Sequence, residues 1–132
     1  MYNILGDCMN IAIDIDDTLT DTFTYLMPFV AEFYEKDFAE LQRNHISYSN
    51  IPKEWRKYEW DFEKHYYDKI VVQTPFKKDA ARYVNLLHQM GHKIVIITGR
   101  TKEFYTDPYA TTEEALRNGN IVYDKLICTL NK

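Results

Sequence analysis

The chain has 132 residues, about the length of one domain, and 45% of them are hydrophobic, which is enough for a single core. Its formal net charge of −4 argues against a duplex nucleic-acid-binding protein, because such proteins need a cationic surface. We see neither an apolar run near the roughly 18 residues of a membrane helix nor a basic secretory leader. Two cysteines, Cys8 and Cys128, are too few for a disulfide framework, so we expect a cytoplasmic protein.

Three short aliphatic runs predict β-strands at residues 11–15, 93–97 and 121–127. Each is rich in β-branched residues and bounded by polar or turn residues. Runs that are apolar on both faces favour a parallel sheet with helices on both sides. We therefore expect an α/β fold with three layers. Met9 lies directly before the first strand and is a natural start, so residues 1–8 are expected to be an extension.

Start and stop signals predict two helices that alternate with the strands. A Thr-Pro pair at 74–75 is typical of a helix start, and Gly91 follows the apolar positions of that helix. Between the second and third strands, Thr111 and Glu114 have the spacing of a capping box, and Gly119 is placed to end the helix.

Residues 20–73 lack a strand-like run and hold 13 of the 20 aromatic residues. We interpret this segment as a helical cap inserted into an α/β core made of residues 9–19 and 74–132. Four aromatic residues recur at helical spacing: Trp55, Tyr58, Phe62 and Tyr66. Packing of the insertion against the core explains this stripe best, and a base-stacking platform is the alternative.

An acidic group follows the first predicted strand. Asp14 and Asp16 point to the same side, because side chains alternate along a strand. The carboxyl ends of parallel strands are where open α/β sheets bind ligands. Two neighbouring carboxylates repel each other unless a cation or hydrogen-bond donors compensate, and Mg²⁺ answers that need. The alternative is a solvated acidic turn that caps the next helix.

The second predicted strand ends in Thr98-Gly99-Arg100. Thr98 offers a hydroxyl, Gly99 allows close approach of a ligand, and Arg100 is a charged donor for an anion. This tripeptide is also a plausible turn. Together with the acidic group on the neighbouring strand, however, it predicts a phosphate site.

The run Asp14-Ile15-Asp16-Asp17-Thr18 resembles the Asp-x-Asp-x-Thr signature of the haloacid dehalogenase-like (HAD) superfamily, and residues 97–100 resemble its second motif. The insertion at 20–73 falls where that superfamily carries a small helical cap. The resemblance extends from Met9 over most of the chain and is nearest to the cytosolic 5′(3′)-deoxyribonucleotidase branch. Many members have glycine where this chain has Asp17.

The resemblance implies a Rossmannoid hydrolase, specifically a phosphatase or nucleotidase. Asp14 would be the nucleophile and Asp16 the general acid and base. Magnesium would bind the Asp14 carboxylate and the Asp16 backbone carbonyl. Thr98, Gly99 and Arg100 would hold the phosphoryl group. Lys125 is the assigned phosphate-binding lysine, with Lys132 and Lys102 as alternatives.

The fourth HAD motif, an acidic pair after a further strand, has no counterpart before the sequence ends. We expect the chain to be a fragment or a shortened product whose first strand is an exposed sheet edge, and we expect that edge to form a homodimer. The predicted function is Mg²⁺-dependent hydrolysis of a small phosphomonoester, with nucleoside monophosphates as candidates. The main alternative is a catalytically inactive binding domain of the same fold. A phospho-acceptor receiver domain fits less well.

Overall fold

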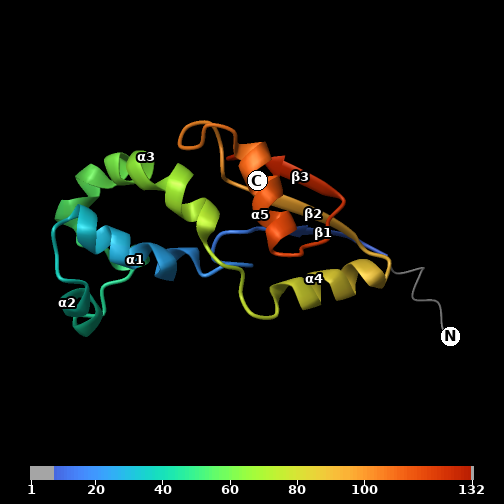
Figure 1. Cartoon of the computed structure of the whole chain (residues 1–132), viewed down its shortest axis with the longest axis horizontal. Helices are drawn as coiled ribbons and strands as arrows, with labels where there is room; N and C mark the ends of the chain where they lie inside the picture. Colours follow the sequence, from blue (N-terminus) through green and yellow to red (C-terminus); the bar gives the residue numbers. More distant parts are fainter. Residues whose placement is uncertain (1–7, 132) are drawn as a thin grey trace.

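The computed structural model describes residues 8–131 and has a mixed α/β architecture (Figure 1). Within that range the strands are β1 (Asn10–Ile13), β2 (Lys93–Thr98) and β3 (Lys125–Cys128). The five α-helices are α1 (Thr22–Phe33), α2 (Phe38–Arg43), α3 (Glu59–Ile70), α4 (Ala80–Gln89) and α5 (Pro108–Asn118). Three 3₁₀ segments are η2 (Tyr48–Asn50), η3 (Lys53–Tyr58) and η4 (Val71–Gln73). The α/β class is confirmed, while residues 1–7 of the expected extension and Lys132 lie outside the described range.

The three strands form one parallel sheet in the order β1–β2–β3. Ile13 of β1 lies beside Ile96 of β2, and Thr98 at the end of β2 lies beside Cys128 of β3. The first strand is therefore an edge strand, as predicted. Because all strands run in the same direction, the segments that follow β1 and β2 leave the sheet at the same end, on the side of the helical segment in Figure 1.

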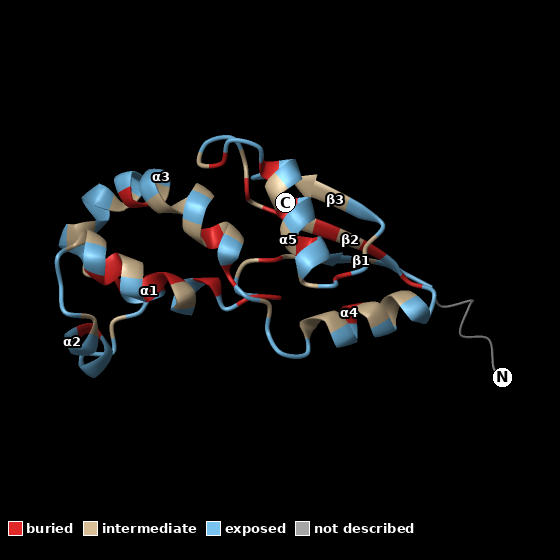
Figure 2. Ribbon diagram, viewed as in Figure 1, coloured by how far each residue is buried: buried red, intermediate tan, exposed pale blue. Residues whose placement is uncertain are grey.

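Helices α4 and α5 cover the same face of the sheet. Ile94 and Ile96 point to this face and are fully buried, together with Val84 of α4 and Leu116 of α5 (Figure 2). Val95 points to the opposite face and is half-buried. Right-handed crossovers between strands in sequential order place their helices on one face. The prediction of three layers is therefore wrong for residues 8–131, which form two.

The third strand starts later than predicted, because the chain at 121–124 first closes the end of helix α5 and packs into the core. Asn120 has a φ of 58°, and the Ile121 amide donates to the Leu116 carbonyl, which closes the end of α5. Ile121 is then buried in the core. Sheet hydrogen bonding begins at Asp124, whose amide donates to the Ile94 carbonyl at 2.8 Å.

Asp124→Asn is expected to lower the free energy of unfolding at neutral pH but not in strong acid. The Asp124 carboxylate accepts the Ile94 amide at 2.7 Å, and this hydrogen bond lowers the pKa of the carboxyl group. The stabilisation is therefore complete above the ordinary Asp pKa of about 3.9 and is lost as the pH falls through the lowered value. Urea unfolding of both proteins at neutral pH and below about pH 3 measures this difference. Equal losses at both pH values would contradict it.

Both predicted helix starts are wrong by several residues. Helix α4 begins at Ala80, because Phe76 instead forms an antiparallel bridge with Thr20, and the 74–79 segment stays non-helical. Helix α5 begins at Pro108, because the Asp107 side chain accepts the Ala110 amide and caps the helix four residues before the predicted cap, Thr111. The predicted helix ends hold, since Gly91 follows α4 with a φ of 97° and Gly119 follows α5.

The segment between β1 and α4 is helical in the structure and has its own hydrophobic cluster, as expected from its composition. Leu26 and Val30 of α1 are fully buried, and Phe62 of α3 is nearly so. The ring of Tyr34 stacks on Trp55 at 5.0 Å between centroids. Of the four stripe residues, Trp55, Phe62 and Tyr66 pack into this cluster, whereas Tyr58 is 47% exposed. These three residues therefore pack as predicted for a buried stripe, but their ring partners lie within the helical segment itself rather than on the α/β core.

Candidate active site

The two motifs meet at the carboxyl end of the sheet. Asp14 and Asp16 follow β1, and Gly99 and Arg100 follow β2. These four residues line one cavity of about 300 Å³, whose opposite wall comes from α1, α3 and the loop after β2. The sequence-based expectation that a parallel sheet brings the two motifs side by side agrees with this arrangement.

Arg100 and Asp16 form a paired hydrogen-bond network. The Arg100 Nε and Nη2 atoms donate to the two Asp16 carboxylate oxygens at 3.1 and 2.9 Å. The Thr22 hydroxyl donates to Asp16 Oδ1 at 2.7 Å. Both oxygens of Asp16 are therefore engaged, and the planar guanidinium fixes the orientation of the carboxylate.

The Arg100 side chain is only 3% exposed, yet its charge is retained. Burial on its own lowers the pKa of the guanidinium, but the hydrogen bonds and negative charge of Asp16 outweigh burial and raise it. The third nitrogen, Nη1, is buried and has no hydrogen-bond partner in the structure. Because Arg100 lines the cavity, its guanidinium is placed to meet an anionic ligand there.

Thr98 contacts a residue of the cavity wall without lining the cavity itself. It is completely buried at the end of β2, and its hydroxyl accepts the Arg100 amide at 3.3 Å. The lining of the cavity includes Gly99 and Arg100 but not Thr98. Its position therefore helps to hold the Gly99-Arg100 turn.

Asp14 and Asp17 occupy different environments. Asp14 is half-buried on the cavity wall, and its Oδ1 accepts the Ile15 amide at 2.9 Å. Asp17 has a φ of 64°, in the left-handed region of backbone space that favours glycine. Its carboxylate accepts the Phe23 amide at 3.2 Å, in the first turn of α1. The third acid of the motif thus acts as a helix cap.

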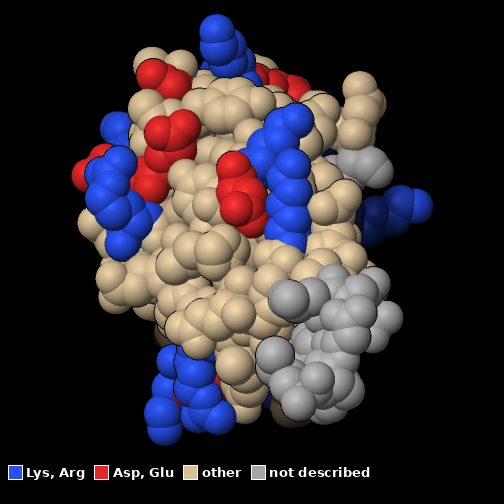
Figure 3. Space-filling model, turned by 90° about the vertical axis from the view of Figure 1, so that its right-hand side faces the viewer, with Lys and Arg blue, Asp and Glu red and all other residues tan. Residues whose placement is uncertain are grey.

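The structure does not bring Lys125 to the cavity. It pairs with Val95 at the start of β3, three residues before the end that borders the site, and its side chain is exposed. Figure 3 shows the face of the molecule around the amino ends of the strands, where basic and acidic side chains are interspersed. Lys102 is exposed and lines a neighbouring cavity, and Lys132 lies outside the described residues. Lys125 is therefore too far along the strand to be a phosphate ligand at this cavity.

Several cavity residues had no counterpart among the predicted site residues. The helical segment contributes Thr22, Phe23, Glu63 and Tyr67, and the loop after β2 contributes Phe104 and Tyr105. Burial raises the pKa of the Tyr105 hydroxyl, so this group stays protonated. No local motif marks the helical residues, since their approach to the acids depends on how α3 packs on α1.

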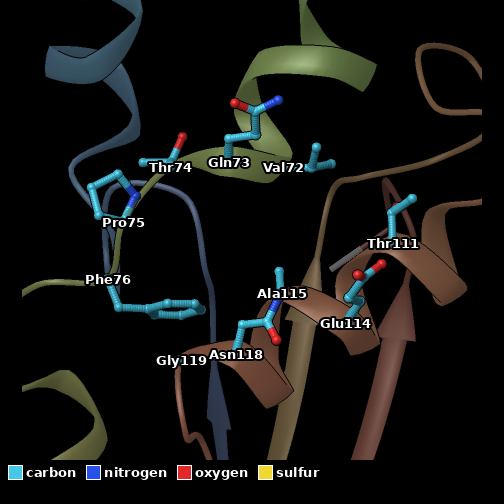
Figure 4. A pocket seen from close by; sticks show the side chains of 10 residues that line it. All are labelled: Val72, Gln73, Thr74, Pro75, Phe76, Thr111, Glu114, Ala115, Asn118 and Gly119. Atoms are coloured by element: carbon cyan, nitrogen blue, oxygen red, sulfur yellow. The ribbon is translucent and has the colours of Figure 1, made fainter.

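A larger cavity of about 510 Å³ lies between residues 72–76 and helix α5 (Figure 4). Its lining includes one carboxylate, Glu114, and no basic side chain. It therefore lacks the paired charges that phosphate chemistry requires, and the smaller cavity is the better candidate for the active site.

The side chains at the smaller cavity fit Mg²⁺ through Asp14. This ion is typically held by one or two carboxylates together with water and substrate phosphate. Asp14 places a carboxylate on the cavity wall, and the Asp16 side-chain oxygens are paired with Arg100 and Thr22. Among residues 8–131, no three His, Cys, Asp or Glu side chains are grouped to hold a metal without further ligands.

Comparisons with protein-family models, curated proteins and solved structures found no match to this chain. Within the described part of the chain, no helix has the length and apolar character to cross a membrane.

Proposed function

We propose that this chain is a HAD-like phosphomonoester hydrolase that acts through an aspartyl-phosphate on Asp14. One observation carries the proposal. Asp14, Asp16 and the buried guanidinium of Arg100 line the same cavity at the carboxyl ends of two adjacent parallel strands. This combination supplies a nucleophile, a second carboxylate and an anion-binding donor in one place.

The reaction takes place in two steps. A carboxylate oxygen of Asp14 attacks phosphorus, and the bond from phosphorus to the ester oxygen breaks. The leaving alkoxide takes a proton from Asp16 and departs as the alcohol. Water then gives its proton to Asp16 and attacks phosphorus, which releases inorganic phosphate and restores the Asp14 carboxylate. Magnesium, when bound, would neutralise charge on the phosphoryl oxygens.

Proton transfer through Asp16 requires its pairing with Arg100 to loosen. In the structure both Asp16 oxygens accept hydrogen bonds, so Asp16 must first separate from Arg100 and take up a proton from solvent before it can act as the acid. A phosphate dianion in the cavity competes with Asp16 for the Arg100 guanidinium and so promotes this separation. Substrate binding and the release of Asp16 are thus coupled in this mechanism.

The proposal is tested by measuring phosphate release from a panel of small phosphomonoesters, including nucleoside monophosphates, with and without Mg²⁺. Release that depends on the enzyme and stops with a chelator supports the hydrolase. The absence of release from every ester, at enzyme concentrations near those of the substrate, would contradict it.

A second candidate function is phosphate-ester binding without turnover. It is favoured by the hydrogen bonds from Arg100 to both Asp16 oxygens, since a carboxylate held in this way is typical of a structural ion pair rather than of a proton donor. Calorimetric binding of a phosphomonoester, combined with no phosphate release in the panel, would select this function over hydrolysis.

The edge of β1 is proposed to form a homodimer. The Met9 carbonyl accepts the Lys93 amide, and every second residue after Met9 in this strand also directs its backbone groups toward β2. The residues between them, such as Ala12, direct their backbone N–H and C=O groups away from β2. Sedimentation velocity is expected to show a dimer that Ala12→Lys converts to a monomer, since a charged edge residue opposes strand pairing. A wild-type monomer at the highest attainable concentration would contradict this. We also propose a cytoplasmic setting, on the ground that the sequence holds too few cysteines for a disulfide framework.

A further inference from the structure

The part of the cavity lining that comes from α1, α3 and the loop after β2 is aromatic and acidic. It contains Glu63 of α3 together with four aromatic side chains: Phe23, Tyr67, Phe104 and Tyr105. Arg100 is the one basic residue of the lining, and it is bonded to Asp16. The part of a substrate that extends away from the phosphate therefore meets a carboxylate and has no basic partner on this wall.

The position of Glu63 is fixed by the helix that carries it. Its neighbour Phe62 is 2% exposed and contacts Phe33 of α1 edge-on at 5.5 Å between ring centroids. Burial, followed by repulsion from Glu59, raises the pKa of the Glu63 carboxyl group. Desolvation of this kind strengthens any hydrogen bond that the carboxylate accepts from a ligand.

Two tyrosine hydroxyls direct their protons toward Glu63. The hydroxyls of Tyr48 and Tyr67 lie 2.8 Å apart, and the Tyr67 hydroxyl donates to Glu63 Oε1 at 3.5 Å. Each phenol has one proton, and Glu63 is a hydrogen-bond partner of both tyrosines. Burial raises the pKa of both phenols, which therefore remain neutral donors. The ionised Glu63 carboxylate presents only acceptor capacity to the cavity.

We infer that Glu63 is a specificity-determining residue that selects phosphomonoesters whose organic part carries a hydrogen-bond donor and excludes those whose organic part carries a second anion. This inference rests on the proposed function, because it assumes that the phosphate lies at Asp14 and Arg100. A hydrogen bond to a carboxylate corresponds to a preference of about 10- to 100-fold in binding. Repulsion between two carboxylates acts against the anionic ester in the same direction.

The test uses two esters of the same size, para-aminophenyl phosphate and para-carboxyphenyl phosphate. Dissociation constants are measured by calorimetry on Asp14→Asn protein without added metal, which separates binding from turnover. The amino ester is expected to bind at least about tenfold more tightly. Adding Glu63→Gln should bring the two dissociation constants to within about threefold, whereas adding the control Glu40→Gln, at an exposed position on α2, should leave the preference intact.

A preference that survives Glu63→Gln would overturn the inference, as would equal binding of the two esters or no binding of either. Glu63→Asp keeps the charge and should keep the discrimination against the carboxy ester, which makes the inference testable should Glu63→Gln fail to fold. If Glu63 determines the binding preference but wild-type protein releases no phosphate, the hydrolase proposal fails and the specificity assignment holds.

Discussion

Phosphate release is expected to fall by a factor on the order of 10⁴ or more when Asp14 is replaced by asparagine. The amide is nearly the same size as the carboxylate, and its oxygen can still accept the Ile15 amide, so the fold should be unchanged. It lacks the negative charge and nucleophilicity needed to attack phosphorus. The measurement is kcat/KM for phosphate release, accompanied by thermal unfolding to show that the variant is folded.

The matched control is Asp61→Asn. Asp61 is an exposed acid in the first turn of α3 and does not line the cavity. It should retain activity within about twofold, because removing a surface charge remote from the cavity changes stability and local potential only slightly. Activity of Asp14→Asn above about a tenth of the wild-type value would contradict the nucleophile assignment.

Arg100→Leu is expected to cost about 3 kcal/mol of unfolding free energy, since it leaves the Asp16 carboxylate without its cation. Arg100 is 3% exposed and Asp16 is 24% exposed, so water compensates the carboxylate only in part. In this variant the Thr22 hydroxyl would still donate a hydrogen bond to the Asp16 carboxylate. Urea unfolding of the wild type, Arg100→Leu, Asp16→Asn and the double variant measures the coupling between the two side chains.

The control for this ion pair is Arg82→Leu. Arg82 and Asp79 are 3.9 Å apart on the surface of α4, with 70% and 49% of their side chains exposed. Loss of such a pair should change stability by less than about 1 kcal/mol. The prediction for Arg100 fails if both replacements cost the same, or if the Arg100 and Asp16 variants are strictly additive.

Sequence was most informative where the chemistry depends on neighbouring strands. Asp14 and Arg100 were placed together because both follow apolar strands, and parallel pairing brings the ends of β1 and β2 to the same edge. Lys125 was misplaced because the apolar run at 121–127 predicts a strand four residues too early. Lys125 is near the carboxyl end of the predicted strand. In the structure it is the first residue of β3, at the end of the strand remote from the cavity.

Helix starts and the second wall of the cavity show different limits of sequence reasoning. Thr111 and Asp107 both carry start signals, and local sequence does not say which of two overlapping caps is used. Glu63 carries no signal at all in a helix that also contains Glu59 and Asp61. Its place at the cavity arises from the packing of Phe62 against α1, which is a contact between residues distant in sequence.

The helical segment therefore has two roles in this molecule. Its cluster of aromatic side chains stabilises α1 against α3, and the same packing directs Glu63 and Tyr67 to the cavity that contains the two aspartates. In the proposed mechanism, the sheet provides the reacting groups and the helical segment provides the surroundings of the organic part of the substrate. Substitutions in the first set should change kcat, and those in the second should change mainly KM.

The role of Asp14 as acceptor of the phosphoryl group is tested most directly by trapping the intermediate. Wild-type protein is mixed with Mg²⁺ and a phosphomonoester, quenched in acid and reduced with borohydride, which converts an aspartyl phosphate to homoserine. Peptide mass spectrometry should find homoserine at position 14 only in samples that received substrate. Phosphate release without any modification at position 14, or with modification at Asp16 instead, would contradict the proposed mechanism.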